Sequence, residues 1–177
     1  NEEAANKVAS ELTSDYGVKS FGFWANVLDR SSLEEVRKKI LSEVGEIDML
    51  INGAGGNSPK ATTKLEQITE ENLDQLEDGF FGLELEGFQK VFDLNFTGTL
   101  LPTMVFAKDM VTRQKGVILN VSSMNAYKPL TKIPAYSAAK SSINNFTEWL
   151  AVHFAKVGVR VNAIAPGFFL TNQNRFL

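Results

Sequence analysis

The chain has 177 residues, 44% of them hydrophobic, which suits one globular domain with a sizeable core. Its net charge of −3 comes without a basic stripe, so nucleic acid is not an expected partner. The lack of cysteine excludes disulfides and thiolate metal sites. No apolar run approaches the roughly 18 residues of a membrane helix, and no signal peptide is apparent. We therefore expect a cytoplasmic protein that does not bind membranes.

Helical and strand-like segments alternate along the chain. Apolar residues at helical spacing predict helices, and short runs of β-branched and aromatic residues predict strands. A polar, acidic stretch over 57–86 is predicted to be a long excursion with one helical turn, and such loops are usually functional or mobile. The predicted elements are helix 2–15, strand 18–25, helix 31–44, strand 47–51, helix 87–112, strand 116–121, helix 135–156 and strand 159–165.

Local signals predict where some of these helices start, bend and stop. Ser31 and Ser32 each precede a glutamate by three residues, which predicts a capping box at the start of the second helix. Glycines at 17, 45 and 158 are expected to end helices. Pro102 is expected to bend the long helix over 87–112.

The alternation of near-continuous apolar strands with helices predicts a parallel sheet covered on both faces. We expect an α/β fold in which residues 1–177 form a single, partial domain. Ligands of such sheets bind beyond the carboxyl ends of the strands. The unusual residues follow the four predicted strands there: Asn26, then 52–56, then Ser122 and Ser123, then Pro166 and Gly167.

The glycine run at 53–56 resembles a phosphate-binding loop at first sight. The dinucleotide fingerprint G-x-G-x-x-G needs a third glycine and a following helix. Gly53 and Gly55 fit the first two positions, but Ser58 stands at the third and Pro59 follows it. Two interpretations remain open: a tight exit from the strand, or a place where a cofactor lies against backbone that has no Cβ.

Tyr136 and Lys140 lie four residues apart near the start of a predicted helix, and hence on one face. A tyrosine hydroxyl ordinarily ionises near pH 10, and a nearby ammonium favours the phenolate, so such a pair can act as a general acid or base. The alternative is a solvated helix face. Ser123 could hold a substrate oxygen beside Tyr136, or be a turn serine. Asn95 is unusual inside a helix and, if buried, needs hydrogen-bond partners.

These residues together resemble the short-chain dehydrogenase/reductase family. The resemblance rests on "INGAGG", Asn95 in "LNFTGT", Ser123 in "NVSSM", the pair Tyr136 and Lys140 in "YSAAK", and "NAIAPG", and it runs the length of the chain. It implies a Rossmann-type, doubly wound parallel sheet and an oxidoreductase that uses NAD or NADP, with NAD the first choice. Such an enzyme leaves the hydride chemistry to its cofactor.

The resemblance also implies a role for each residue. Tyr136 would donate or accept the proton, Lys140 would assist it and bind the nicotinamide ribose, Ser123 would orient the substrate oxygen, and Asn95 would hold a water in a proton relay. The adenine side of the cofactor would lie near Asn26, Asn52, Gly53, Ala54 and Gly55. Its nicotinamide side would lie near Pro166, Gly167 and Thr171. No metal site is expected, and His153 is expected to be structural.

The chain departs from the family pattern in two ways. Gly53 and Asn26 stand where the family usually has asparagine and aspartate. The glycine-rich phosphate loop, the two strands around it and the C-terminal end of the family's fold are missing from this chain. We therefore expect residues 1–177 to be part of a longer enzyme.

Within the family, the sequence is most similar to the bacterial D-mannonate oxidoreductases (fructuronate reductases). This likeness implies a sugar-acid substrate, with Asn125, Lys132 and Arg175 as candidates to bind its carboxylate and hydroxyls. The alternatives are a reductase of another ketose, polyol or 3-oxoacyl substrate, or a non-catalytic NAD(P)-binding regulator. The resemblance also implies a homotetramer or homodimer.

Overall fold

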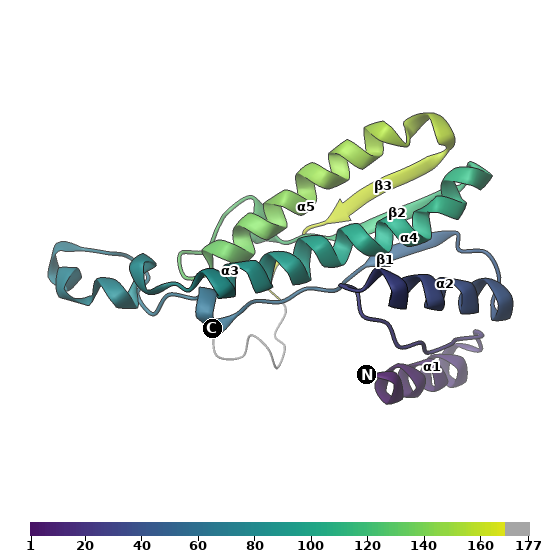
Figure 1. Cartoon of the computed structure of the whole chain (residues 1–177), viewed down its shortest axis with the longest axis horizontal. Helices are drawn as coiled ribbons and strands as arrows, with labels where there is room; N and C mark the ends of the chain where they lie inside the picture. Colours follow the sequence, from purple (N-terminus) through teal and green to yellow (C-terminus); the bar gives the residue numbers. More distant parts are fainter. Residues whose placement is uncertain (169–177) are drawn as a thin grey trace.

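The computed structural model describes residues 1–168 of the chain, which contain a sheet of three parallel strands (Figure 1). The strands are β1 (Met49–Asn52), β2 (Gly116–Val121) and β3 (Val159–Ile164), adjacent in that order. Asn52 lies opposite Asn120, and Val121 lies opposite Ile164. The carboxyl ends of all three strands therefore meet at one edge, and the predicted Rossmann-type α/β arrangement is confirmed.

Helices connect these strands in the manner of βαβ units. α4 packs on β1 and β2, α5 packs on β3, and α2 packs on α4. A charged pair between Arg37 and Asp109 joins α2 to α4. The helices are α1 (Glu2–Tyr16), α2 (Arg30–Glu43), α3 (Leu85–Phe92), α4 (Gly98–Arg113) and α5 (Pro134–His153).

The core lies between the sheet and its covering helices. Ile118 and Met110 are fully buried there and pack with Leu150 of α5 and Val161 of β3. Each such side chain stabilises the fold by roughly 1.5–3 kcal/mol through burial. A second cluster between α2 and α4 contains Leu33, Val36, Val105 and Phe106.

The opposite face of the sheet is open in the described part of the chain. Strand side chains alternate between faces, and those that point away from α4 and α5 are exposed on β1 and β3 and half-buried on the central strand β2. Met49 and Ile51 of β1 are both 57% exposed, and Ile164 of β3 is 47% exposed. Exposed apolar side chains on a strand of this kind are unusual, since parallel sheets are normally buried on both faces.

The strand predicted over 18–25 is not formed. These residues run without regular structure, although Phe23 and Ala25 pack against the cluster between α2 and α4. A strand is defined by hydrogen bonds to a neighbouring strand, and within residues 1–168 this segment has no such neighbour. Composition predicts which side chains suit a sheet, but it does not report whether a partner strand lies alongside.

The predicted helix ends are confirmed only in part. Asp29, rather than Ser31 or Ser32, caps α2 and accepts a hydrogen bond from the Ser31 N–H. The Ser32 hydroxyl instead accepts from the N–H of Asn26. Gly17 ends α1 as predicted, with φ of 65°. The helix that Gly158 was expected to end stops earlier, at His153, and Gly158, with φ of 67°, follows the 3₁₀ turn Ala155–Val157 instead.

The helix predicted to run unbroken over 87–112 is interrupted at Asn95. A π-helical turn, Asp93–Thr97, separates α3 from α4, and α4 continues through Pro102. Turns of this kind occur mostly as single insertions and are frequent at functional sites. The interruption therefore falls on the polar residue that looked out of place in a helix.

The predicted excursion forms a projecting arm at one end of the molecule (Figure 1). Its helical turn is confirmed as an irregular 3₁₀ segment, Glu70–Asp78. At the base of the arm, the Thr63 N–H donates to the carbonyl of Lys132 at 3.0 Å. Lys60 Nζ lies 2.9 Å from a carboxylate oxygen of Glu84 and 2.9 Å from one of Glu86. The arm is therefore tied to the loop that precedes α5.

The cap of α2 provides a direct test of this fold. Replacing Asp29 by alanine should lower the free energy of unfolding by about 1 kcal/mol, because the Ser31 N–H loses its acceptor. Ser31→Ala should change it by much less, since the Ser31 side chain makes no cap bond. Urea denaturation of both variants measures the difference, and an equal loss in the two would contradict the assignment.

Candidate active site

The Asn95 side chain is completely buried and has hydrogen bonds on both ends of its amide. Nδ2 donates to the carbonyls of Gly56 and Val91, both at 2.7 Å, and Oδ1 accepts from the Gly56 N–H at 3.2 Å. A buried amide needs such partners. These bonds fasten the loop after β1 to the π-helical turn.

Lys140 is brought to the same edge of the sheet by α5. Only 4% of the residue is exposed, and Nζ donates to the carbonyl of Val121 at 2.8 Å. Nζ also lies 5.6 Å from the ring centre of Tyr136, one helical turn earlier and half-buried. The structure thus brings Tyr136 and Lys140 together on one face of α5, as their spacing predicts.

The start of α5 is held in place by small side chains. Ala135 and Ala139 are fully buried against Val91 of α3 and Ala61 at the base of the arm. Pro134 occupies the first helical position, where its missing N–H costs nothing. Close packing of this kind fixes the direction in which Tyr136 and Lys140 point.

Burial lowers the pKa of Lys140 from 10.5 to about 8. Taking an ammonium out of water disfavours its charged form, and no carboxylate within residues 1–168 raises the pKa of Lys140 again. The amine can therefore exchange a proton close to neutral pH. Lowered lysine pKa values of this kind are common at catalytic sites, although burial alone also produces them.

Gly55 lies in the narrow space between these two residues. A Cβ at this position would come within 2.7 Å of Asn95 Oδ1 and 3.2 Å of Lys140 Nζ. A Cβ at Gly53, by contrast, would meet no heavy atom of residues 1–168 within 4 Å, and the same is true at Gly167 after β3. Within the described residues, the glycines at this edge thus leave backbone open at Gly53 and Gly167 and pack it against Asn95 and Lys140 at Gly55.

Ser123 follows β2 directly and is 8% exposed. Its Oγ accepts from the N–H of Asn125 at 3.2 Å, and no group in residues 1–168 accepts its proton. The hydroxyl is therefore free to donate to a ligand. Asn125 is 5% exposed, and its Oδ1 has no hydrogen-bond partner in the described part of the chain.

The remaining predicted residues are distributed around this edge. The carbonyl of Pro166 accepts from the Met124 N–H at 3.1 Å, which ties the segment after β3 to the Ser123 loop. Asn26 is exposed in a turn, where its Oδ1 accepts from the Leu28 N–H. Ala54 and Lys132 are half-buried. Thr171 and Arg175 lie outside the described residues.

The Asn52 side chain is turned inward, which the sequence does not reveal. It is 5% exposed, and Nδ2 donates to Asn120 Oδ1 and to Thr103 Oγ1. Asn120 in turn donates to Thr147 Oγ1 of α5. An asparagine in the middle of the apolar strand "GVILNV" is the one sequence signal that could have indicated this buried polar network.

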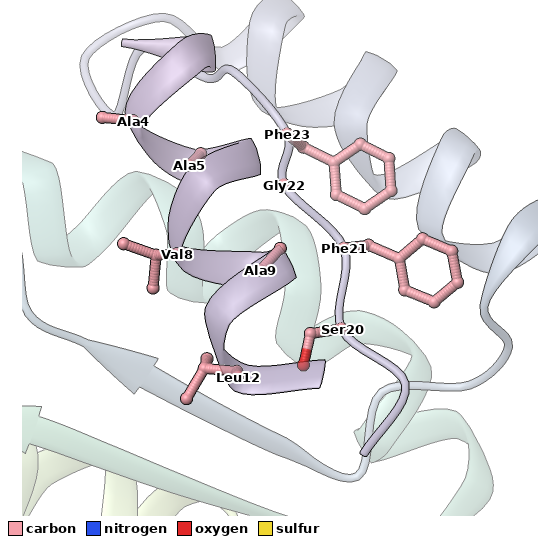
Figure 2. A pocket seen from close by; sticks show the side chains of 9 residues that line it. All are labelled: Ala4, Ala5, Val8, Ala9, Leu12, Ser20, Phe21, Gly22 and Phe23. Carbon is pink, nitrogen blue, oxygen red and sulfur yellow. The ribbon is translucent and has the colours of Figure 1, made fainter. Parts of the chain in front are cut away.

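An open groove elsewhere on the molecule lacks these features. It lies between α1 and residues 20–23 and is lined mainly by alanine and other apolar side chains, with Ser20 contributing a hydroxyl (Figure 2). In residues 1–168 no cluster of three or more His, Asp and Glu side chains could hold a metal ion. No helix in this part of the chain is long and apolar enough to cross a membrane.

The family of the chain follows from its similarity to known proteins. The family model of the short chain dehydrogenases matches residues 1–177. The chain belongs to the short-chain dehydrogenase family. The sequence resemblance and the residues around Tyr136 are thus explained by common descent.

Similar proteins are longer than this short-chain dehydrogenase sequence. An uncharacterized oxidoreductase of Haemophilus influenzae is 55% identical over 174 residues, which are 98% of this chain and 60% of the relative. A Haemophilus structure with bound NAD, provisionally described as a D-mannonate oxidoreductase, has a TM-score of 0.91 and 55% identity, over 98% of this chain and 61% of its own.

More distant short-chain dehydrogenases differ in their substrates. A 3-oxoacyl-[acyl-carrier-protein] reductase of Aquifex aeolicus is 33% identical over 99% of this chain and 63% of the relative. A 2-dehydro-3-deoxy-D-gluconate 5-dehydrogenase of Formosa agariphila is 32% identical over 89% of this chain and 53% of the relative. The chain thus spans between 53% and 63% of the length of these proteins.

The buried lysine of this short-chain dehydrogenase should make stability depend on pH. The unfolded chain binds a proton at Lys140 up to pH 10.5, whereas the folded chain releases it near pH 8. Stability should therefore rise with pH between these values, by on the order of 3 kcal/mol. The gain in the free energy of unfolding of Lys140→Met over wild type should be largest at pH 7 and should shrink as the pH rises to 10.5. Denaturation of both proteins across this pH range measures this gain, and a gain that stays constant with pH would contradict the prediction.

Gly55→Ala should damage the site because the new Cβ collides with Asn95 and Lys140. A buried overlap of this kind costs about 1–3 kcal/mol. We expect a lower melting temperature and a loss of cofactor binding in the full-length protein. Gly53→Ala, whose Cβ meets no atom of the described residues within 4 Å, is the control for stability and should melt like wild type. Equal melting of the two variants would show that the space at Gly55 is not needed.

Proposed function

We propose that the full-length protein is an NAD-dependent oxidoreductase of a sugar acid that interconverts D-fructuronate and D-mannonate. The observation that carries this proposal is the meeting of Asn95, Gly55 and Lys140 at the carboxyl edge of the sheet, with Tyr136 one turn away on α5. Family membership supports the reaction class. The Haemophilus relative, described with bound NAD and as a D-mannonate oxidoreductase, supports the cofactor and the substrate.

The residues present fit a nicotinamide cofactor along this edge. Gly53 and Gly167 leave open backbone at the ends of β1 and β3, where a flat group can approach closely. Gly53, Ala54 and Gly55 would line the adenosine side together with Asn26, and Asn52 would support them from the interior. Pro166, Gly167 and Thr171 would line the nicotinamide side. When bound, the nicotinamide supplies the hydride to the substrate carbon or takes it back.

The chain's own residues move the proton. In the direction of reduction, the hydroxyl of Tyr136 gives its proton to the carbonyl oxygen of the substrate, which becomes the new hydroxyl. Ser123 donates a hydrogen bond to the same oxygen, since its proton has no other acceptor within residues 1–168. Lys140 replenishes the proton of Tyr136, and its pKa of about 8 suits exchange near neutral pH. Asn95 holds the surrounding backbone in place.

The substrate's hydroxyls and carboxylate need polar partners beside Ser123. Asn125 lies two residues after Ser123 and keeps an amide oxygen without a partner, so it is our candidate to bind a substrate hydroxyl. An unpaired buried acceptor is costly, and a ligand donor would relieve that cost. Lys132 and Arg175 are the candidates for the carboxylate, for which the guanidinium of Arg175 has the better-matched geometry.

We also propose that the protein is a homotetramer or homodimer. Large apolar side chains are exposed on α4 and α5: Met104 at 50%, Trp149 at 56% and Val152 at 79%. Trp149 stacks on Phe146 and on His153, whose ring centre lies 4.5 Å away. Large apolar side chains exposed in this way are common where proteins associate.

Turnover tests both the reaction and its acid. The absorbance of NADH should fall when the full-length protein is mixed with D-fructuronate, and acetoacetyl thioesters should not replace the uronate. Tyr136→Phe should lower kcat by at least about 100-fold through loss of the proton donor, with cofactor binding retained. Tyr16→Phe on α1, where Tyr16 is 73% exposed, is the control and should be fully active.

The possible results separate the parts of the proposal. Oxidation of neither NADH nor NADPH with any of these substrates would defeat the enzyme assignment. Turnover of the thioester alone would defeat the substrate assignment. Near-normal kcat in Tyr136→Phe would defeat the assignment of the acid.

A further inference from the structure

A chain of buried hydrogen bonds links the Asn95 turn to the catalytic helix α5, through the interior of the molecule. It begins at the Asn95 carbonyl, which accepts from Thr99 Oγ1 at 2.9 Å. The Thr99 carbonyl accepts from Thr103 Oγ1 at 2.7 Å. Thr103 Oγ1 accepts from Asn52 Nδ2 at 2.9 Å. The chain has thus passed from α4 to β1.

From β1 it continues across the sheet. Asn52 Nδ2 also donates to Asn120 Oδ1 at 2.8 Å, which the pairing of these residues in register makes possible. Asn120 Nδ2 donates to Thr147 Oγ1 at 2.8 Å, and Thr147 donates to the Ile143 carbonyl at 2.7 Å. We call the set the polar ladder. Asn95 contributes its backbone carbonyl, and the other members contribute side-chain groups. The residues of the ladder are at most 7% exposed: Asn95, Thr99, Thr103, Asn52, Asn120 and Thr147.

The direction of each hydrogen bond in the polar ladder is fixed. Thr103 gives its proton to the Thr99 carbonyl, so it can only accept from Asn52, which must present its NH₂ group. Thr147 gives its proton to the Ile143 carbonyl, so Asn120 must present its NH₂ group to Thr147 and its oxygen to Asn52. A network that is fully satisfied in one arrangement specifies a single geometry.

An apolar interface between helices and a parallel sheet would be expected at these positions. Purely apolar contacts allow small sliding movements, whereas a buried amide that loses its partner is penalised. The polar ladder therefore resists sliding of α4 or α5 along the sheet. One end of the ladder is the Asn95 carbonyl, and the other end lies on α5, the helix that carries Tyr136 and Lys140.

We propose that the polar ladder is a positioning element for the reaction, which sets the Asn95 turn relative to Lys140 and Tyr136 on α5. This inference rests on the proposed function for its effect on catalysis. Thr103, Asn120 and Thr147 act as positioning residues, because they lie in the interior and touch the catalytic groups only through the ladder.

Removal of single hydroxyls tests the proposal in the full-length protein. Thr103→Val and Thr147→Val keep the side-chain shape and leave an amide hydrogen of Asn52 or Asn120 without an acceptor. We expect kcat to fall about tenfold or more, because small displacements of reacting groups are costly, while KM for NADH changes less than about twofold. Thr103→Ser and Thr147→Ser restore the hydroxyl and should restore kcat.

Thr112→Val is the matched control on α4. Thr112 Oγ1 makes the same bond to a carbonyl four residues earlier, that of Lys108, but it is exposed and lies outside the polar ladder. This variant should have the kcat of wild type. If a ladder valine variant fails to fold, Thr99→Val serves instead, because it removes the link to Asn95 without stranding an amide.

A second measurement does not depend on turnover. NMR titration of lysine ε-carbons, with the Lys140 signal assigned through Lys140→Met, reports the pKa of Lys140 directly. Loosening of α5 should admit water to Nζ, so the valine variants should raise this pKa from about 8 toward 10.5. The proposal would be overturned if both valine variants kept the kcat and the Lys140 pKa of the wild type and showed only a lower melting temperature. A wild-type protein without turnover would defeat the proposed function, and the titration would still decide the role of the ladder.

Discussion

The carboxyl edge of the sheet depends on the buried amide of Asn95. An asparagine amide offers two donors and an acceptor, and here Gly56 and Val91 take all of them. The amide thereby bonds a loop to a helix at a point where the helix has widened into a π turn. Without that turn, α3 and α4 would form one regular helix, and the loop after β1 would lack its partner. The close approach of Gly55 to Lys140 follows from this arrangement.

The buried lysine shows the cost of the same arrangement. The Lys140 ammonium has a carbonyl acceptor and an aromatic neighbour. No carboxylate within residues 1–168 stabilises its charge, and burial lowers its pKa to about 8. A leucine at this position would stabilise the fold more. The buried lysine therefore makes the fold less stable, but its amine can exchange a proton near neutral pH. Such exchanges of stability for activity are common in enzymes.

Local patterns in the sequence were sufficient to predict much of this site. The four-residue spacing of Tyr136 and Lys140 places both on one helix face, and serine and glycine after buried strands fall at one edge of a parallel sheet. Asn95 could be singled out because asparagine is poor in helix interiors. Each of these predictions depends on residues close in sequence or on the direction shared by parallel strands.

The parts that were not predicted depend on contacts between distant residues. Thr103 is 51 residues from Asn52, and Asn120 is 68 residues from it, so no local pattern relates them. The segment 18–25 has the composition of a strand, but a strand forms only when a neighbouring strand bonds to it, and the residues of the segment do not reveal whether one does. The cap of α2 was assigned to the wrong residue because Asp29, Ser31 and Ser32 are all good cap formers. Only the backbone geometry distinguishes among them.

The glycine run after β1 is now explained by two different constraints. Gly55 must be glycine because Asn95 and Lys140 occupy the space where a Cβ would lie. A Cβ at Gly53 would meet no atom of residues 1–168 within 4 Å, so packing within this part of the chain does not require a glycine there. A phosphate loop would need its glycines for a tight turn into a helix, whereas 3₁₀ structure at Pro59–Ala61 follows here. The run therefore combines a glycine required by interior packing at 55 with a glycine at 53 whose backbone is open among the described residues.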